Sequence, residues 1–188
     1  MLRIFKSALI EYIEAFFTSI LVLIAIYVFI AFPVTVQGIS MEPNLHTGDR
    51  LLVETLTPRI NGFERGDIVV LSAHEQGVSG MLTELLVKRV VGLPGERVKV
   101  FNCKVYIYKN SQIYELKEEI YLPSGSCTLG GRKIEDGRPY TIPEGEYMVL
   151  GDNRENSSDS RNIGFVKKDN IQGKVVLLFF PTDKIRLY

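Results

Sequence analysis

The sequence predicts a mainly β protein that follows a single apolar helix at the N-terminus. Two observations lead to this prediction: one long uncharged segment near the start, and a series of short β-branched runs separated by Gly and Pro in the remainder. The chain has 188 residues, 46% of them hydrophobic, which is enough for one modest globular domain and an appendage. Its 22 basic and 22 acidic side chains cancel, so a nucleic-acid partner is not expected.

The uncharged segment begins at Ala15 and reads "AFFTSILVLIAIYVFIAF", and the next charged side chain is Glu42. At a rise of about 1.5 Å per residue, a helix of this length can cross a bilayer. The apolar core of a cleaved signal peptide is shorter, about 7 to 15 residues. We therefore expect a transmembrane helix over 15–33. Arg3 and Lys6 precede it and no Lys or Arg follows closely, so residues 1–14 are expected in the cytoplasm and the rest outside it.

The remainder of the chain is expected to form an antiparallel, barrel-like β domain from residues 34–100 and 144–188. Residues 101–143 are richer in Tyr, Lys, Glu and Gly than the runs on either side, and we expect them to form an inserted smaller β subdomain. The run "VVLLFFP" near the C-terminus is too short for a second membrane span. The predicted strands are "DRLLVETL", "GDIVVLS", "TELLVKRVVG", "ERVKVF", "KVYIY", "GEYMVLGD" and "KVVLLFF".

The two cysteines, Cys103 and Cys127, are compatible with one disulfide in an oxidising compartment or with two unpaired thiols. Their spacing matches no zinc-binding pattern, so no metal site is predicted. The sequence contains neither G-x-G-x-x-G nor the Gly-Lys-Ser/Thr of a phosphate-binding loop. We therefore expect no cofactor.

Lys88 and Arg89 interrupt an apolar strand in "LLVKRVVGLPGE". Because side chains alternate along a strand, the two point to opposite faces, and one is expected to face a covered side. Burial lowers the pKa of a lysine and makes the neutral amine available as a base. The alternative is that both residues are exposed charges that protect an edge strand from aggregation.

Two polar segments are candidates for a reactive site. "VQGISMEPNL" places Ser40 shortly after the apolar segment, and "GDNRENSSDSRNIGF" at 151–165 combines Asp, Asn, Ser and Arg. The second segment lacks the ligand pattern of a calcium loop, which favours a network of side chains that supports a site. The only histidines, His46 and His74, are expected at the surface, so a reactive serine would require another base, and Lys88 could provide it.

Four motifs together resemble, in order and spacing, those of bacterial type I signal peptidases: "GISMEP" (38–43), "RGDIVV" (65–70), "KRVVGLPGE" (88–96) and "GDNRENSSDSR" (151–161). The resemblance implies a serine endopeptidase that removes signal peptides from secreted preproteins. It implies that Ser40 attacks the scissile carbonyl, that Lys88 accepts the serine proton as general base, and that water then releases the acyl-enzyme.

The same resemblance implies roles for five supporting residues. Ser157 would hydrogen-bond and orient the Lys88 amine, Asp159 and Arg161 would form a bracing ion pair, and Asp152 would pair with Arg89.

The oxyanion site departs in part from the family pattern. The resemblance implies the N–H of Ser40 as one donor to the oxyanion. Some family members have a hydroxyl at the position of Gly38, so the second donor is not assigned. Asn44 also stands where the family usually has threonine.

The resemblance further implies small residues at the first and third positions before the cut. Met41, Pro43 and the "LLV" strand residues are candidates to contact them, and for Met41 a place in the core is the alternative. The implied location is the plasma membrane near the secretion translocon. Two alternatives stay open: a Ser-Lys peptidase dedicated to conjugative pilin or organelle inner-membrane precursors, and a non-catalytic, membrane-anchored domain that binds partners through residues 101–143.

Overall fold

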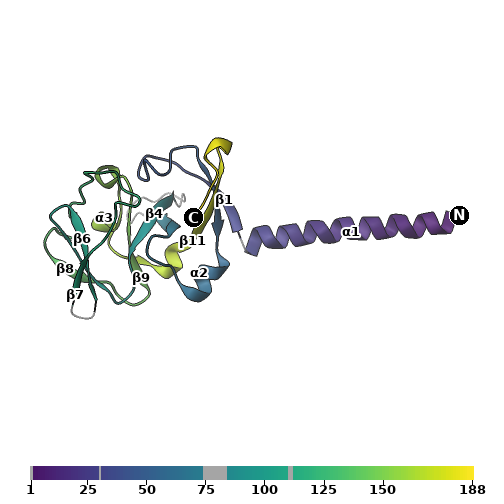
Figure 1. Ribbon diagram of the computed structural model, residues 1–188. Coiled ribbons are helices and arrows are strands. Elements are labelled where there is room, and N and C mark those ends of the chain that lie inside the picture. The colour runs from purple at the N-terminus through teal and green to yellow at the C-terminus, as the bar shows by residue number, and fades with distance from the viewer. Residues whose placement is uncertain (1, 30, 74–83, 110–111) are drawn as a thin grey trace.

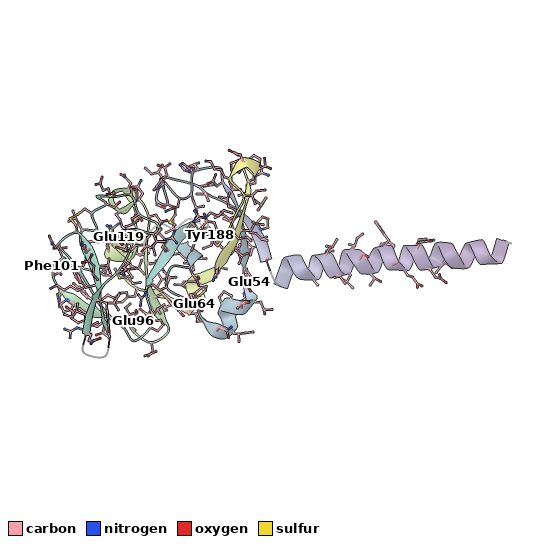
Figure 2. All side chains as sticks on the ribbon, in the orientation of Figure 1. Glu54, Glu64, Glu96, Phe101, Glu119 and Tyr188 are labelled. Atoms are coloured by element: carbon pink, nitrogen blue, oxygen red, sulfur yellow. A yellow bond between two sulfur atoms is a disulfide. The ribbon has the colours of Figure 1, made fainter. Side chains whose placement is uncertain are left out.

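The computed structural model describes residues 2–29, 31–73, 84–109 and 112–188, and the predicted mainly β fold is confirmed. Helix α1 (Leu2–Phe29) extends away from the β domain, and Figure 2 shows its drawn side chains clear of that domain. It begins at Leu2, before the predicted span 15–33. It ends at Phe29, earlier than predicted, because Ala31–Thr35 forms strand β1. Within the described ranges, no helix has both the length and the hydropathy required to cross a bilayer, so the transmembrane prediction is not confirmed.

The larger sheet has eight strands, and its strand pairs are all antiparallel. The order is β1-β2-β11-β3-β4-β9-β10, with β12 paired to β11. Among the described strands no pairing joins β1 to β10, so hydrogen bonding does not close the predicted barrel. The strands are β1 (Ala31–Thr35), β2 (Arg50–Glu54), β3 (Ile68–Ala73), β4 (Glu84–Gly92), β9 (Glu146–Leu150), β10 (Val166–Lys167), β11 (Ile171–Phe180) and β12 (Arg186–Leu187).

The smaller sheet lies at the end of the molecule opposite α1 (Figure 1), in the order β7-β6-β5-β8. It begins at Arg97, slightly before the predicted boundary of the inserted subdomain. Asn102 and Cys103 join β5 to β6 with φ of 49° and 64°, as in a two-residue turn with both residues left-handed. The strands are β5 (Arg97–Phe101), β6 (Lys104–Lys109), β7 (Gln112–Glu115) and β8 (Pro139–Thr141).

Cys103 and Cys127 form a disulfide, which decides between the two alternatives for these residues. The bond attaches the β5–β6 turn to the long connection between β7 and β8. The short helices α2 (Leu56–Asn61) and α3 (Ser160–Ile163) were not predicted, because one turn or so carries no detectable helical periodicity.

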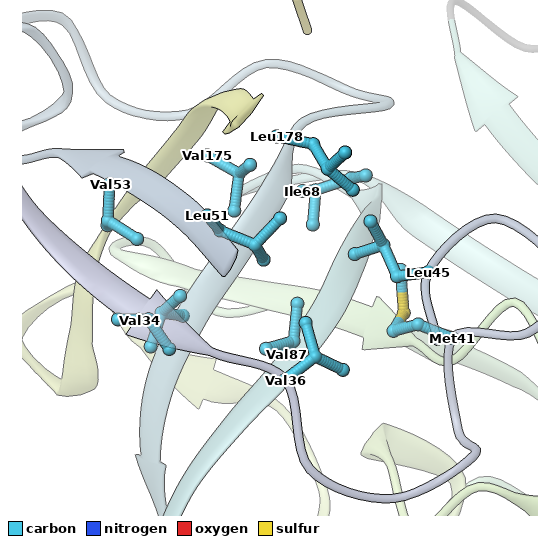
Figure 3. Packing of buried hydrophobic residues seen from close by; sticks show 11 residues of the cluster. Val34, Val36, Met41, Leu45, Leu51, Val53, Ile68, Val87, Val175 and Leu178 are labelled. Atoms are coloured by element: carbon cyan, nitrogen blue, oxygen red, sulfur yellow. The ribbon is translucent and has the colours of Figure 1, made fainter. Parts of the chain in front are cut away.

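One apolar core supports the strands that approach the serine motif (Figure 3). Strand β2 alternates between its two faces as a half-buried strand does, with Leu51 and Val53 fully buried. Met41 and Leu45 insert into the same core from the connection between β1 and β2. Met41 is only 1% exposed, which agrees with the core alternative for this residue.

Candidate active site

Ser40 lies in the connection between β1 and β2, and this connection is fixed at both ends. The N–H of Val36 donates to the carbonyl of Asp49 at 2.8 Å, and the N–H of Gly48 donates back to the carbonyl of Val36 at 3.0 Å. Met41 is buried directly after the serine. Ser40 is therefore held half-buried at the edge of the core rather than on a free loop.

Strand β4 brings Lys88 to the serine. β4 lies between β3 and β9, with Lys88 opposite Val69, so it is an internal strand. Lys88 is 2% exposed and Arg89 is 7% exposed. The alternative that this pair protects an exposed edge strand is therefore wrong.

The side chains of Lys88 and Ser40 are in direct contact. Nζ of Lys88 donates to Oγ of Ser40 at 2.8 Å and to the carbonyl oxygen of Val87 at 2.9 Å. Burial lowers the pKa of Lys88 from 10.5 to about 8, against the opposing effect of the carboxylates of Asp159 and Asp152. A large share of the amine is consequently neutral near pH 8, which a general base requires.

The segment that follows β9 contributes a buried ion pair with the other charge of β4. Nε and Nη2 of Arg89 donate to the two carboxylate oxygens of Asp152 at 2.8 and 2.6 Å. Nδ2 of Asn44 donates to the same carboxylate at 2.8 Å, and Nη1 of Arg89 donates to the carbonyl of Gly66. The predicted pairing of these two residues is present, and Asn44 supplies a contact that the sequence alone did not suggest.

A second buried ion pair is formed by Asp159 and Arg161, as predicted. Nε and Nη2 of Arg161 each donate to an oxygen of Asp159 at 2.8 Å. Asp159 also accepts the backbone N–H of Gly151 at 3.0 Å. A side chain at Gly151 would collide with the carbonyl oxygen of Ser40 and with Oγ of Ser157. The glycine therefore allows this segment to approach the serine closely.

The structure corrects the expectation for Ser157. Its Oγ is buried and has no hydrogen-bond partner among the described residues, so the expected bond to the Lys88 amine is not made. The hydrogen bonds that Nζ donates are instead directed to Ser40 and Val87. Ser157 still lies beside the site, because Gly151 brings it close to the Ser40 backbone.

Asn153 is a site residue that the sequence reasoning did not single out. Its backbone N–H donates to the carbonyl of Ser40 at 3.0 Å, and its Nδ2 donates to the carbonyl of Ile39 at 3.2 Å. It lies within the motif at 151–161, but nothing in that motif specifies a partner more than a hundred residues earlier. These two bonds attach the segment directly to the serine loop.

The remaining predicted site residues are placed as follows. Gly38 has φ of +83°, a conformation that favours glycine. Pro43 is exposed and lines a cavity of about 280 Å³ together with Asp152 and Asn153. His46 makes its hydrogen bonds through its backbone within the described part of the chain, and His74 lies outside the described residues.

Comparison with known proteins assigns the family. The family model described as "Signal peptidase, peptidase S26" matches residues 9–180. The chain belongs to the peptidase S26 family of signal peptidases. All four motifs lie within the matched residues, so the family predicted from them is confirmed.

Relatives within the S26 family match almost the whole chain. Signal peptidase I of Bacillus licheniformis is 36% identical over 186 residues, covering 96% of this chain and 94% of the relative. Signal peptidase IB of Staphylococcus aureus is 33% identical with the same two coverages. A crystal structure of a signal peptidase I from Enterococcus faecalis is 28% identical, with a TM-score of 0.41, and the match covers 60% of this chain and 95% of that one.

Proposed function

We propose that this protein removes signal peptides from secreted preproteins, with Ser40 as nucleophile and Lys88 as general base. The observation that carries the proposal is the 2.8 Å contact between Nζ of Lys88 and Oγ of Ser40. Family membership and the relatives named signal peptidase I support the same activity. The proposed reaction uses only the serine hydroxyl, the lysine amine and water.

The reaction follows from this contact. The neutral amine of Lys88 accepts the Oγ proton while Oγ of Ser40 bonds to the scissile carbonyl carbon. The tetrahedral intermediate breaks the C–N bond, and the Lys88 ammonium returns its proton to the departing amine. Water then transfers a proton to Lys88 as its oxygen attacks the ester, which releases the signal peptide as a carboxylic acid and restores the serine.

The developing negative charge needs a hydrogen-bond donor. We assign the backbone N–H of Ser40, which makes no hydrogen bond to another group within the described ranges. Gly38 carries no side chain at the position where some family members have a hydroxyl. The second donor would therefore come from a backbone group or from water.

The two buried ion pairs would hold the segment after β9 against the dyad. Asp152 neutralises the buried charge of Arg89, and Asp159 is fixed by Arg161. Burial lowers the pKa of Lys88, and the carboxylates of Asp159 and Asp152 oppose this lowering. They thus contribute to the pH range in which the amine is neutral.

The substrate would approach past the residues beside Ser40. Pro43 lines a cavity together with Asn153, whose N–H donates to the carbonyl of Ser40, and this supports a role for Pro43 in substrate contact. Met41 is better explained as a core residue that positions the serine, because it packs with Leu45 and Val36.

We also propose that the apolar N-terminal helix associates with the plasma membrane, with the N-terminus in the cytoplasm and the β domain outside it. The support is the absence of charged side chains from Ala15 to Met41 and the exposed apolar side chains of α1 between Phe16 and Ile24. This location would place Ser40 near preproteins at the bilayer surface and near the translocon. Alkaline extraction should retain the wild type in the membrane and release a Leu21→Lys/Ile24→Lys variant, whereas Glu11→Lys should stay bound.

The decisive experiment for the dyad is cleavage of a preprotein with an Ala-x-Ala site by detergent-solubilised protein. We expect cleavage by the wild type and losses of at least about 100-fold in Ser40→Ala and Lys88→Ala, because a general base alone contributes about 10²–10⁴. His46→Ala is the control and should retain activity. Retained activity in Lys88→Ala would exclude lysine as the base. Cleavage of only one preprotein among several would favour the dedicated peptidase, and cleavage of none would favour the binding domain.

A further inference from the structure

The guanidinium of Arg154 joins the segment after β9 to the inserted subdomain. Arg154 is 4% exposed, and its Nη1 and Nη2 donate to the two carboxylate oxygens of Glu118 at 2.9 and 2.5 Å. Nη1 also donates to the hydroxyl of Thr128, and Nε donates to the carbonyl of Gly151 at 3.1 Å. One side chain therefore contacts both the connection between β7 and β8 and the segment that supports the dyad.

Glu118 is buried, and both of its carboxylate oxygens accept hydrogen bonds from Arg154. It is 8% exposed and accepts the hydroxyl of Tyr121 at 2.7 Å in addition to the two bonds from Arg154. Burial disfavours the charge on Arg154, but the hydrogen bonds and charge of Glu118 outweigh it and raise the pKa of Arg154. Two charges removed from water in this way are stable only when they stay together.

The disulfide fixes the second contact of Arg154. Cys127 is adjacent to Thr128, and the N–H of Thr128 donates to the carbonyl of Cys103 at 2.9 Å. The Cys103–Cys127 bond therefore holds Thr128 against the β5–β6 turn. Opening this bond would release the residue that presents its hydroxyl to Arg154.

On its other side, Arg154 contacts the residues around the dyad. Its carbonyl accepts Nη2 of Arg161 at 2.6 Å, and Arg161 holds Asp159. Asp159 in turn accepts the N–H of Gly151, which lies against the backbone of Ser40. A continuous series of bonds and contacts therefore runs from the inserted subdomain to the nucleophile.

We propose that Arg154 and Glu118 are positioning residues for the Ser40–Lys88 dyad, and that the Cys103–Cys127 disulfide supports their contact. The inserted subdomain thereby participates in the reaction without touching the substrate. This inference rests on the proposed peptidase function. It predicts that loosening the contact moves the segment at 151–161 and rehydrates Lys88, even when the fold persists.

The test compares Glu118→Gln with Glu115→Gln. Glu115 is also in the inserted subdomain and pairs with Lys104, but both side chains are more than a third exposed, which makes it the matched control. In Glu118→Gln we expect kcat to fall by about 10- to 100-fold with KM within about twofold, since small displacements of a site cost rates of this order. Glu115→Gln should match the wild type.

Two readouts separate positioning from simple support of the fold. Rehydration raises the pKa of a buried lysine, so the midpoint of the pH-rate profile should move upward in Glu118→Gln. Backbone amide exchange at Gly151 and Arg161 should accelerate while exchange in the large sheet stays unchanged. An unchanged midpoint together with unchanged exchange at 151–161 would overturn the proposal.

Cys103→Ser/Cys127→Ser provides the second variant in case Glu118→Gln does not fold. It should produce smaller changes in the same directions. A thiol reductant should produce the same changes in the wild type and should have no further effect on the double variant, which has no disulfide to reduce. Amide exchange needs no substrate, so it decides the coupling even where the wild type cleaves no preprotein. Failure of cleavage with intact coupling would therefore reject the peptidase function alone.

Discussion

Nζ of Lys88 lies 2.8 Å from Oγ of Ser40, although the two residues are 48 positions apart in the sequence. Ser40 is held by a connection that begins and ends in the core, and Lys88 is held by an internal strand of the larger sheet. Their contact is thus determined by the packing of the sheet, and its chemistry depends on how strongly burial affects the lysine.

The first prediction concerns pH. Because the reaction needs neutral Lys88 and its pKa is about 8, kcat/KM should rise through a midpoint near pH 8. Below it the neutral fraction falls about tenfold per pH unit, so the rate at pH 6 should be about 100-fold below the plateau. Cleavage rates from pH 5 to 10 measure this, with circular dichroism to establish that the fold persists. A flat profile down to pH 5 would contradict a lysine base.

The same shift affects stability. The pKa of Lys88 is lower in the folded protein than its ordinary value of 10.5, so the unfolded chain binds more protons between about pH 8 and 10.5. The contribution of Lys88 to the free energy of unfolding should therefore rise with pH in this window and reach its minimum below pH 8. Urea denaturation of the wild type and Lys88→Met isolates it, because the variant lacks the titrating group. If the free energies of unfolding of the two proteins changed in parallel with pH, a lowered pKa of Lys88 in the folded protein would be contradicted.

The pair formed by Arg89 and Asp152 should be important for stability. Arg89→Ala would leave the carboxylate of Asp152, 2% exposed, without its cation, and such losses cost about 3–5 kcal/mol. Lys174→Ala is the control, because its pair with Asp67 is more exposed and should contribute at most about 1 kcal/mol. Equal effects of the two substitutions on chemical denaturation would show that burial does not govern the strength of these pairs.

Gly151→Ala should damage the site more than the fold. Its methyl group would collide with the Ser40 carbonyl and with Ser157, so the two segments must separate. We expect kcat to fall about 100-fold. Gly145→Ala is the matched control: its φ of +75° is strained for alanine, but no atom lies within 4 Å of the added methyl group. It should cost about 1 kcal/mol of stability and leave cleavage rates unchanged; similar rates in both variants would refute the close-approach argument.

Ser157→Ala should stabilise the protein. A buried hydroxyl without a partner costs about 1–3 kcal/mol, and removal of Oγ relieves that cost. Ser160→Ala should have the opposite effect, because the Ser160 hydroxyl accepts the N–H of Val149 at 2.9 Å. Thermal denaturation of both variants provides the comparison. A loss of stability in Ser157→Ala would indicate that its hydroxyl is hydrogen-bonded in solution.

The strands could be predicted because their apolar and β-branched residues form runs of the right length. All seven predicted runs contain strands. β1 was missed because Ala31 and Phe32 continue the apolar composition of the preceding helix, so no change marks the boundary. Pro33 is accommodated there because β1 is the first strand of the sheet order.

The site could be predicted in part. The apolar neighbours of Lys88 and Arg89 predicted a covered side for one of the two without deciding which, and both are buried. The resemblance supplied the pairing of Lys88 with Ser40 and the two ion pairs. Glu118 could not be found in this way, because its partner Arg154 is 36 residues away and neither local sequence specifies the other. The missing partner of Ser157 depends on the exact packing beside Gly151, which residue types alone do not determine.

Because Lys88 and Arg89 point to opposite faces of β4, the register of this strand determines which of the two side chains faces Ser40. Pairing of Val69 with Lys88 and of Ile68 with Arg89 presents an amine to Ser40. A slip of one residue would exchange the two faces and present a guanidinium, which keeps its proton at all ordinary pH values. A sheet in that register could still hydrogen-bond along its length, but Ser40 would have no base. Correct strand alignment in this enzyme is therefore a condition for reactivity as well as for folding.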